Sequence, residues 1–245
     1  VHLPLGNAAI LEAQILMLSS HNILNPANGA PIKVPSQDMV LGLYYITKEL
    51  NGAKGEGSVF YSSEEAIIDY NEKKADLHAK VKVMFTDMHG KKSLIDTTVG
   101  RIIFNEIVPE EVGYINKLLT KKSLRDIITD VLKVAGTPKT SDFLDDIKNL
   151  GYSMAFKGGL SFNLADVIVP TEKVELVNAG YQQVEDVMNN YNMGFITNNE
   201  RYNQIIDIWT HTNANLTNIV MKQLSEDRGG FNSVYMMLDS GARGS

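Results

Sequence analysis

The most regular pattern of apolar and polar positions lies in residues 170–226, where apolar residues recur at alternating steps of three and four. The positions are Val174, Val177, Tyr181, Val184, Met188 and Tyr191, and then Tyr202, Ile205, Trp209, Thr212, Leu216 and Ile219. A period near 3.5 residues is typical of helices that pack along a seam. Gly194 separates the two series, and Thr197 with Glu200 forms a capping box for the second helix. The pattern predicts an antiparallel coiled-coil hairpin whose second helix is about 40 Å long.

Residues 22–45 pass abruptly from a polar loop to an apolar segment. Three prolines exclude a helix or a central strand from the first half: Pro26, Pro31 and Pro35. Residues 39–46 are apolar almost all round, which predicts a buried helix with Ser36 as N-cap and Asp38 in its first turn. Gly42 inside that helix costs about 1 kcal/mol relative to Ala, so we expect another backbone to approach it closely. On this pattern alone, the segment is either an ordinary loop–helix joint or a cavity wall that presents polar side chains.

Shorter elements fill the rest of the chain. The predicted helices cover residues 7–19, 62–74, 123–134 and 141–156, and the strand signals cover residues 78–85 and 94–107, with a turn at 87–90. Gly136 is expected to end the third of these helices. The predicted fold class is therefore α+β, with mixed helices, a small antiparallel sheet and the long helical hairpin.

Composition and charge exclude several kinds of site. The chain has no Cys, which excludes disulfides and thiolate-bound zinc, and its net charge of −6 argues against a free-standing nucleic-acid-binding domain. No apolar run reaches the ~20 residues of a membrane span, and no secretory signal is visible. His78 and His89 have no obvious third ligand, and three aspartates, Asp142, Asp145 and Asp146, suit the positive end of a helix. We therefore expect no metal site and no catalytic residue within this chain.

Four sequence blocks give a more specific signal. They read Val-His-Leu-Pro-Leu at residues 1–5; Asn-Pro-Ala-Asn-Gly at 25–29, Pro-Ser-Gln-Asp at 35–38 and Gly-Leu-Tyr-Tyr at 42–45; Glu-Arg-Tyr-Asn at 200–203 with Asp-Ile-Trp at 207–209; and Phe-Asn-Ser-Val-Tyr-Met-Met at 231–237 with Ser-Gly-Ala-Arg-Gly-Ser at 240–245. In this order the blocks resemble the β′ subunit family of bacterial RNA polymerase, just downstream of its catalytic metal-binding loop. The resemblance spans the chain and is looser over residues 58–160.

The resemblance implies the pore and funnel region, which lines the secondary channel of the polymerase. It divides the chain into a pore-like α+β region, residues 1–165, and a funnel or rim region, residues 166–245, that holds the hairpin and the C-terminal segment. The first region would comprise an active-site-proximal segment at 1–57, a β-rich part at 58–108 and a helical part at 109–165.

In this family the secondary channel admits nucleoside triphosphates and receives the RNA 3′ end during backtracking. The resemblance places five residues near the nucleotide or the RNA end: Asn25, Asn28, Gln37, Asp38 and Arg243. Of these we expect Gln37 and Arg243 to face the ligand, because a guanidinium pairs well with triphosphate charge. Five residues near the hairpin turn are candidates for docking coiled-coil transcript-cleavage factors: Glu200, Arg201, Tyr202, Asn203 and Asp207.

The resemblance also sets expectations for activity and partners. The parent enzyme is a DNA-directed RNA polymerase, a nucleotidyltransferase, and an Asn-Ala-Asp-Phe-Asp-Gly-Asp loop just before the residue that matches Val1 holds its magnesium. Because that loop is not in this sequence, we expect the isolated chain to bind no magnesium and to be inactive. The implied partners are the β, α and ω subunits, the rest of β′, template DNA, the RNA transcript, nucleoside triphosphates and cleavage factors, in the cytoplasm and without a membrane.

The sequence begins without Met and stops inside a recognisable block, so we expect it to be a segment of a longer polypeptide. The alternative is a free-standing α+β adaptor that presents a coiled-coil hairpin for protein binding. An adaptor explains the acidity and the lack of a catalytic set equally well. It does not explain why the Pro-Ser-Gln-Asp and Ser-Gly-Ala-Arg-Gly-Ser blocks occur in one chain.

Overall fold

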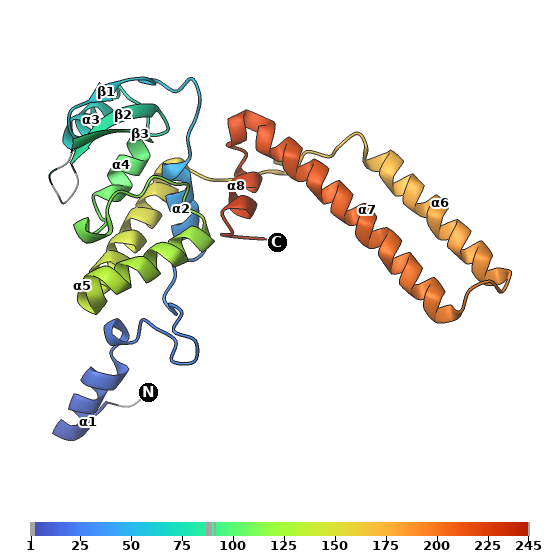
Figure 1. The fold of residues 1–245 in the computed structure, drawn as a ribbon, viewed down its shortest axis with the longest axis horizontal. Coiled ribbons are helices and arrows are strands. Elements are labelled where there is room, and N and C mark those ends of the chain that lie inside the picture. Colours follow the sequence, from blue (N-terminus) through green and yellow to red (C-terminus); the bar gives the residue numbers. More distant parts are fainter. Residues whose placement is uncertain (1–2, 87–89, 91, 245) are drawn as a thin grey trace. The chain divides into compact units, whose positions relative to one another are not determined.

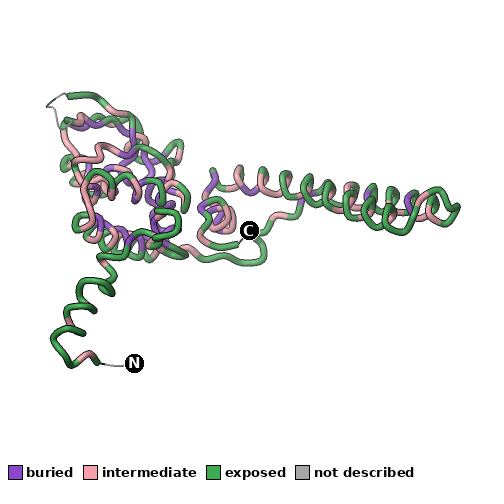
Figure 2. Tube along the Cα trace, turned by 60° about the horizontal axis from the view of Figure 1, so that its bottom comes forward, coloured by how far each residue is buried: buried purple, intermediate pink, exposed green. Residues whose placement is uncertain are grey.

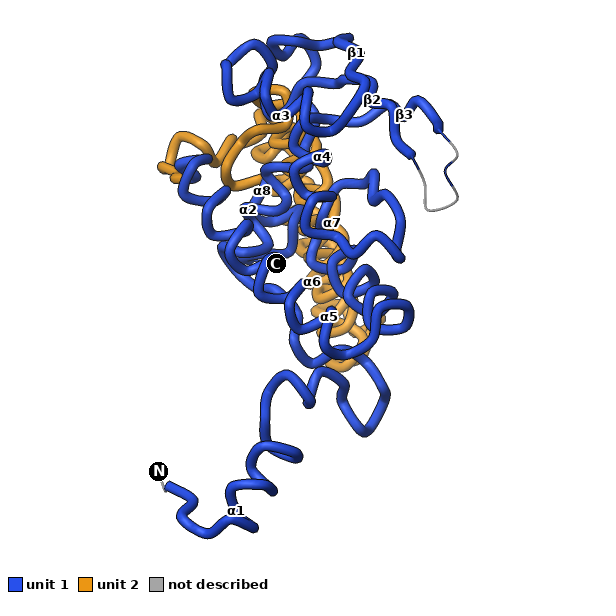
Figure 3. Tube along the Cα trace, turned by 90° about the vertical axis from the view of Figure 1, so that its left-hand side faces the viewer, with its two compact units in different colours: residues 1–160, 236–245 blue, residues 161–235 orange. Residues whose placement is uncertain are grey.

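The computed structural model describes residues 3–86, 90 and 92–244, which divide into two compact units (Figures 1 and 3). Unit 1 comprises Val1–Leu160 and Met236–Ser245, and unit 2 comprises Ser161–Tyr235. The chain therefore leaves unit 1, forms unit 2 and returns. The predicted division after residue 165 differs from this one mainly at the C-terminus, because the last residues group with unit 1 and not with the hairpin.

Two helices, α2 (Asp38–Thr47) and α5 (Lys121–Gly158), form the centre of unit 1. A Cβ atom on Gly42 would collide with the backbone of Gly151 in α5, which confirms the predicted close approach. Helix α5 is interrupted at Gly136, where φ is 76° and ψ is 174°, so the two predicted helices lie on either side of this glycine. Apolar side chains from these elements and their neighbours form the core: Val40, Leu43, Phe104, Leu119, Leu124, Ile128, Phe143 and Ile147.

The sheet of unit 1 has the order β1-β2-β3, with strands β1 (Val59–Phe60), β2 (Lys80–Thr86) and β3 (Lys92–Thr98). β2 and β3 are antiparallel, with Lys80 opposite Thr98, whereas β1 runs parallel to β2. The predicted antiparallel pairing is confirmed for β2 and β3, and the short parallel strand β1 makes the sheet mixed. Of the predicted turn at 87–90, only Gly90 lies within the described residues, and His89 lies outside them.

The strand predicted at 94–107 ends early, at Thr98. The hydroxyl of Thr98 accepts the N–H of Arg101 and caps helix α4 (Val99–Asn105). A Cβ atom on Gly100 would collide with a carbonyl of α2, so α4 packs directly on the central helix. The prediction was wrong because an apolar run continues through both elements, and burial against α2 decides the conformation. Helix α3 (Ser63–Asn71) also packs on the sheet, and turn η3 (Glu110–Val112) follows α4.

The N-terminal helix is shorter than the 7–19 predicted. The structure has α1 (Asn7–Glu12), then a π-helical turn η1 (Ala13–Met17) and a 3₁₀ turn η2 (Ser19–His21). Leu11 and Ile15, which defined the predicted apolar face, are 56% and 61% exposed. Because these apolar side chains stay exposed, packing contributes little to holding one regular helix here. Val1 and His2 of the first sequence block lie outside the described residues.

Unit 2 contains the predicted hairpin, with α6 and α7 side by side (Figure 1). Its elements are η4 (Leu164–Asp166), α6 (Lys173–Asn192), α7 (Asn198–Glu226), η5 (Asp227–Gly230) and the start of α8 (Ser233–Asp239). Tyr181 and Trp209 meet edge to face with ring centroids 5.0 Å apart, and Gly180 lets α7 approach α6. The Thr197–Glu200 capping box is also confirmed.

Few residues of the hairpin are fully buried, in contrast to unit 1 (Figure 2). Its two helices pack mainly on each other, so each keeps a wide solvent-facing surface. Among the residues that the structure describes, no helix is both long and apolar enough to cross a membrane.

Candidate functional site at the start of α2

The loop that carries Asn25 and Asn28 is closed by its own hydrogen bonds. The Asn25 side-chain oxygen accepts the N–H of Ala27, and the Asn28 side-chain oxygen accepts the N–H of Ala30, both at 3.0 Å. The Asn25 N–H donates to the Ala30 carbonyl at 2.9 Å. Both asparagines therefore shape the loop, as turn asparagines commonly do. Their proximity to a nucleotide stays a prediction.

Gln37, the residue just before α2, has an unusual backbone conformation, with φ of 48° and ψ of −122°. It occupies the N-cap position without a capping hydrogen bond, so the prediction that Ser36 caps this helix was wrong. A non-glycine residue held in such a conformation costs about 1–3 kcal/mol, and residues of this kind cluster at functional sites. Asp38 occupies the first turn of α2 as predicted.

The structure brings Asp38 and Arg243 together although 205 residues separate them in the sequence. The Nη2 atom of Arg243 lies 2.9 Å from Oδ1 of Asp38, and both side chains are about half exposed. Three of the five predicted residues, Gln37, Asp38 and Arg243, therefore occupy one end of α2. An exposed pair of this kind contributes only about 0–1 kcal/mol, so the arginine can exchange Asp38 for an anionic ligand at little cost.

Two further contacts, which sequence reasoning missed, tie the segment before Arg243 to α2 and to the start of α5. The hydroxyl of Tyr44 in α2 donates to Oδ2 of Asp239 at 2.6 Å, and Lys48 donates to that hydroxyl at 3.3 Å. The Ser240 carbonyl accepts the N–H of Lys121, at the start of α5, at 2.9 Å. Burial lowers the pKa of Lys48, while the nearby Asp239 and Glu49 carboxylates oppose that shift.

Comparison with known families identifies the chain. Residues 22–167 match the model of the family described as RNA polymerase Rpb1, domain 3, and residues 196–245 match that of RNA polymerase Rpb1, domain 4. The chain belongs to the RNA polymerase Rpb1 domain 3 family. The resemblance to the polymerase subunit that the four sequence blocks indicated is thereby confirmed. Residues 168–195, which include all of α6, lie between the two matched segments.

Individual polymerase subunits are similar over the whole chain. It is 70% identical to the DNA-directed RNA polymerase subunit β′ of Bacteroides thetaiotaomicron, 68% to that of Parabacteroides distasonis and 60% to that of Flavobacterium psychrophilum. In each case the alignment covers all of this chain. It covers 17%, 17% and 18% of the length of the respective β′ subunits. The chain therefore corresponds to a segment spanning about a sixth of the length of the curated subunits it matches.

The predicted docking residues of this Rpb1-family chain fall into two groups. Glu200 and Arg201 already have structural contacts: Glu200 accepts the Thr197 N–H at 2.7 Å, and the Arg201 guanidinium lies 4.5 Å from the centre of the Tyr191 ring. Hydrogen bonds from Thr197, first from its backbone and then from its hydroxyl, hold the pKa of Glu200 below its ordinary value. The other three residues, Tyr202, Asn203 and Asp207, are exposed on α7 and are free to meet a partner.

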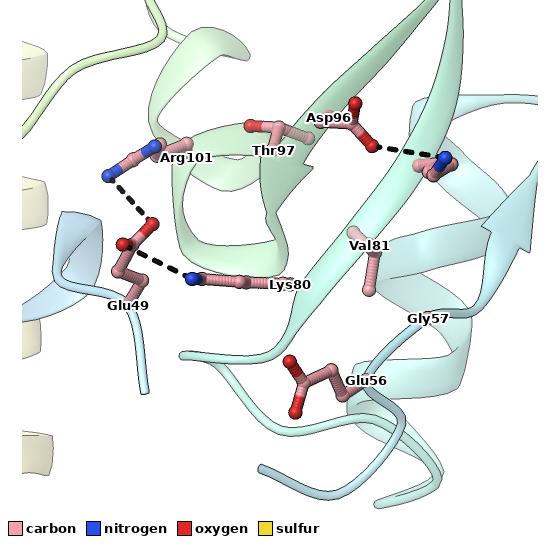
Figure 4. Close-up of a pocket in the computed structure, with 9 residues that line it drawn as sticks. Glu49, Glu56, Gly57, Lys80, Val81, Asp96, Thr97 and Arg101 are labelled. Carbon is pink, nitrogen blue, oxygen red and sulfur yellow. Dashed lines mark ion pairs between the residues drawn. The ribbon is translucent and has the colours of Figure 1, made fainter. Parts of the chain in front are cut away.

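A second polar region of unit 1 is a cleft of about 370 Å³ beside the sheet (Figure 4). Its charges largely pair with each other: Glu49 lies 3.3 Å from Lys80 and 3.8 Å from Arg101, and Lys82 lies 3.5 Å from Asp96. Glu49, in the loop after α2, is thus paired with β2 and α4, while the Lys82–Asp96 pair joins β2 to β3. Among the described residues, no group of three or more His, Asp or Glu side chains could hold a metal ion.

Proposed function

We propose that this chain forms part of the wall and rim of the secondary channel in a bacterial DNA-directed RNA polymerase, through which nucleotides enter and backtracked RNA leaves. The observation that carries this proposal is the half-exposed contact between Arg243 and Asp38 beside the strained Gln37. All three belong to sequence blocks that resemble the polymerase active-site region. Asn25 and Asn28 would belong to the same wall.

The chemistry of this site suits a nucleoside triphosphate or the phosphates of an RNA end. Without a ligand, the Asp38 carboxylate compensates the positive charge of Arg243. An incoming triphosphate offers several anionic oxygens in the geometry that a guanidinium binds through two parallel hydrogen bonds. Gln37 can donate or accept one further hydrogen bond, and its backbone strain fixes the direction in which its side chain leaves the chain.

The parent enzyme would perform the nucleotidyl transfer, and this chain would position its substrate. In a two-metal mechanism, converging carboxylates hold ions about 4 Å apart. Such carboxylates would come from elsewhere in the β′ subunit, so we expect the isolated chain to be inactive. The proposed partners are the other subunits β, α and ω, the rest of β′, template DNA, transcript and nucleotides, in the cytoplasm.

Replacing Arg243 by Ala in a polymerase assembled with the full-length subunit tests the proposal. Loss of a charge-assisted contact is worth roughly 1.5–3 kcal/mol, so the apparent KM for nucleotides should rise about tenfold or more. Elongation rates measured over a range of nucleotide concentrations give this value. Unchanged elongation at limiting nucleotide would remove Arg243 from the site.

A second function is proposed for the hairpin, which would dock coiled-coil transcript-cleavage factors near its turn. The exposure of Tyr202, Asn203 and Asp207 on one stretch of α7 favours this role. The adaptor hypothesis would use the same surface. The identity to β′ subunits over the whole of this chain favours the polymerase over the adaptor.

A further inference from the structure

Arg243 lies on a segment that has no helix or strand of its own. Helix α8 ends at Asp239, and the following residues form only turns and bends. Such a segment samples many conformations unless side chains or neighbouring elements hold it, and fixing each residue costs about 1–2 kcal/mol. The position of the Arg243 guanidinium therefore depends on contacts made before the chain reaches it.

One of these contacts joins Asp239, at the end of α8, to a buried side chain of α2. Tyr44 is fully buried, with 0% of its surface exposed, and its hydroxyl donates to Asp239 at 2.6 Å. Lys48 donates to the same hydroxyl at 3.3 Å and lies 5.2 Å from the centre of the Tyr44 ring. Hydrogen bonds between a hydroxyl and a carboxylate are roughly twice as strong as neutral ones, and this one joins elements that are 195 residues apart.

Backbone hydrogen bonds made by Ser240 and Arg243 then fix the direction of the chain after α8. Ser240 is fully buried, and its carbonyl accepts the Lys121 N–H at 2.9 Å. The Arg243 N–H donates to the Met237 carbonyl at 3.2 Å, which closes the turn after α8. By contrast, the Asp38–Arg243 pair is half exposed and screened by water, so it cannot by itself hold a long, flexible side chain in one place.

We propose that Tyr44 and Asp239 are positioning residues for Arg243: the hydrogen bond from the buried Tyr44 side chain to Asp239 holds the segment that presents the guanidinium to the nucleotide. This inference rests on the proposed role of Arg243 in binding nucleotide phosphates. Preorganising a ligand-binding group raises affinity because the ordering cost is met before the ligand arrives. Tyr44 itself lies in the core and does not touch the nucleotide.

The test uses Tyr44→Phe, which removes one hydroxyl and keeps the ring, in a polymerase that carries the full-length subunit. One hydrogen bond is worth about 0.5–1.5 kcal/mol, so the apparent KM for nucleotides should rise about twofold to tenfold. The rate at saturating nucleotide should stay close to that of the unchanged enzyme. Asp239→Asn serves as the second variant, because it removes the charge from the same hydrogen bond.

Tyr114→Phe is the matched control. It also removes a tyrosine hydroxyl from unit 1, one that lies 2.9 Å from the Thr97 hydroxyl and away from the Arg243 segment. A purely structural loss should affect both tyrosine variants alike. Equal changes in KM for Tyr44→Phe and Tyr114→Phe would overturn the inference.

A double variant separates this inference from the proposed function. If Tyr44 acts through Arg243, adding Tyr44→Phe to Arg243→Ala should raise KM no further than Arg243→Ala alone, because coupled residues are not additive. If the two effects multiply, the positioning role fails while the nucleotide role of Arg243 stands. If Arg243→Ala alone leaves KM unchanged, the proposed function and the inference both fail.

A direct measurement on the 245-residue chain needs no catalysis. Nuclear magnetic resonance relaxation of the Gly241 amide and of the Arg243 side-chain Nε–H group reports their motion on the picosecond to nanosecond scale. Tyr44→Phe and Asp239→Asn should increase that motion, whereas Tyr114→Phe should not. Unchanged order at both groups in the Tyr44 and Asp239 variants would overturn the inference.

Discussion

The two units of this chain reach stability in different ways. Unit 1 is built from residues far apart in sequence: α2 packs on α5, and the C-terminal segment returns to α2 across 195 to 205 residues. Unit 2 is built mainly from two neighbouring helices that meet along one local seam. Most of the fully buried apolar side chains lie in unit 1, while in the hairpin only Gly180, Val187 and Leu224 are buried. The proposed nucleotide site thus lies in the non-local unit, and the proposed docking surface in the local one.

The largest expected effect comes from two matched glycine substitutions. Gly42→Ala places a methyl group into the backbone of α5, and neither helix backbone can move aside. The free energy of unfolding of unit 1 should therefore fall by about 3 kcal/mol or more. Gly180→Ala meets a Thr212 hydroxyl and the Trp209 ring at 3.3 Å, and these side chains can adjust. Its effect should stay within about 1 kcal/mol. Chemical unfolding followed by circular dichroism measures both, and a severe loss in the Gly180 variant would contradict the comparison.

Removing the central aromatic contact of the hairpin should affect unit 2 alone. Trp209→Ala removes the ring that meets Tyr181 and should cost about 2–3 kcal/mol, somewhat less than a fully buried aromatic residue. Hydrogen exchange should then quicken in α6 and α7, while α2 and α5 keep their protection. Equal loss of protection in α5 would mean that the two units unfold together.

A smaller effect concerns pH and the buried His78 of unit 1. Burial lowers the pKa of His78, against the opposing influence of the Lys48 carbonyl and the Asp76 carboxylate. The unfolded chain gains this proton as pH falls below about 6.5, while the folded chain resists it. Stability from this group is therefore complete above that pH and declines as pH falls toward the lower pKa of the folded state.

The measurement compares His78→Gln with the unchanged chain between pH 7.5 and pH 5. The loss of unfolding free energy on acidification should be smaller in the variant than in the unchanged chain, because a glutamine side chain takes up no proton in this range. His211, exposed on α7, provides the matched control through His211→Gln. Identical pH profiles for the unchanged chain and the His78 variant would exclude this histidine as the cause.

The smallest effect is expected for factor docking. Charge reversal at Arg201 or Asp207 should weaken binding of a coiled-coil cleavage factor several-fold, as surface charges at an interface commonly do. Asp207→Lys is the cleaner variant, because Arg201 also stacks on Tyr191. Lys222→Glu, on the exposed surface near the base of α7, should leave binding unchanged. Calorimetric titration that finds binding sensitive only to Lys222 would place the docking surface at the other end of the hairpin.

The contrast between the units also explains what the sequence could predict. The hairpin follows from a period of 3.5 residues, and such a pattern needs no information from distant parts of the chain. The end of β3 could not be found in this way, because the apolar run continues into α4 and only Thr98 marks the boundary. The helix predicted at 7–19 is shorter in the structure, because Leu11 and Ile15 on its apolar face stay exposed and gain little from packing.

The candidate site was only partly predictable for the same reason. Arg243 and Asp38 could be named from their sequence blocks, but their contact depends on how the chain returns after unit 2. The Tyr44–Asp239 hydrogen bond could not be predicted from the sequence, since a tyrosine inside an apolar helix indicates only a core position. The strain at Gln37 was also invisible, because nothing in its flanking residues indicates a positive φ.

Contacts at the base of the hairpin do not depend on how long its two helices are. Arg228, with φ of 50°, begins a run of three left-handed residues that turns the chain after α7, and its guanidinium lies 2.7 Å from Asp166. Asn232 donates to the Asp166 carbonyl at 2.9 Å, so hydrogen bonds join the chain segments that enter and leave the hairpin. Inserting seven residues into each helix would keep the seam in register and lengthen the rod by about 10 Å. Evolution or a designer can therefore change its reach without altering the ends that connect it to unit 1.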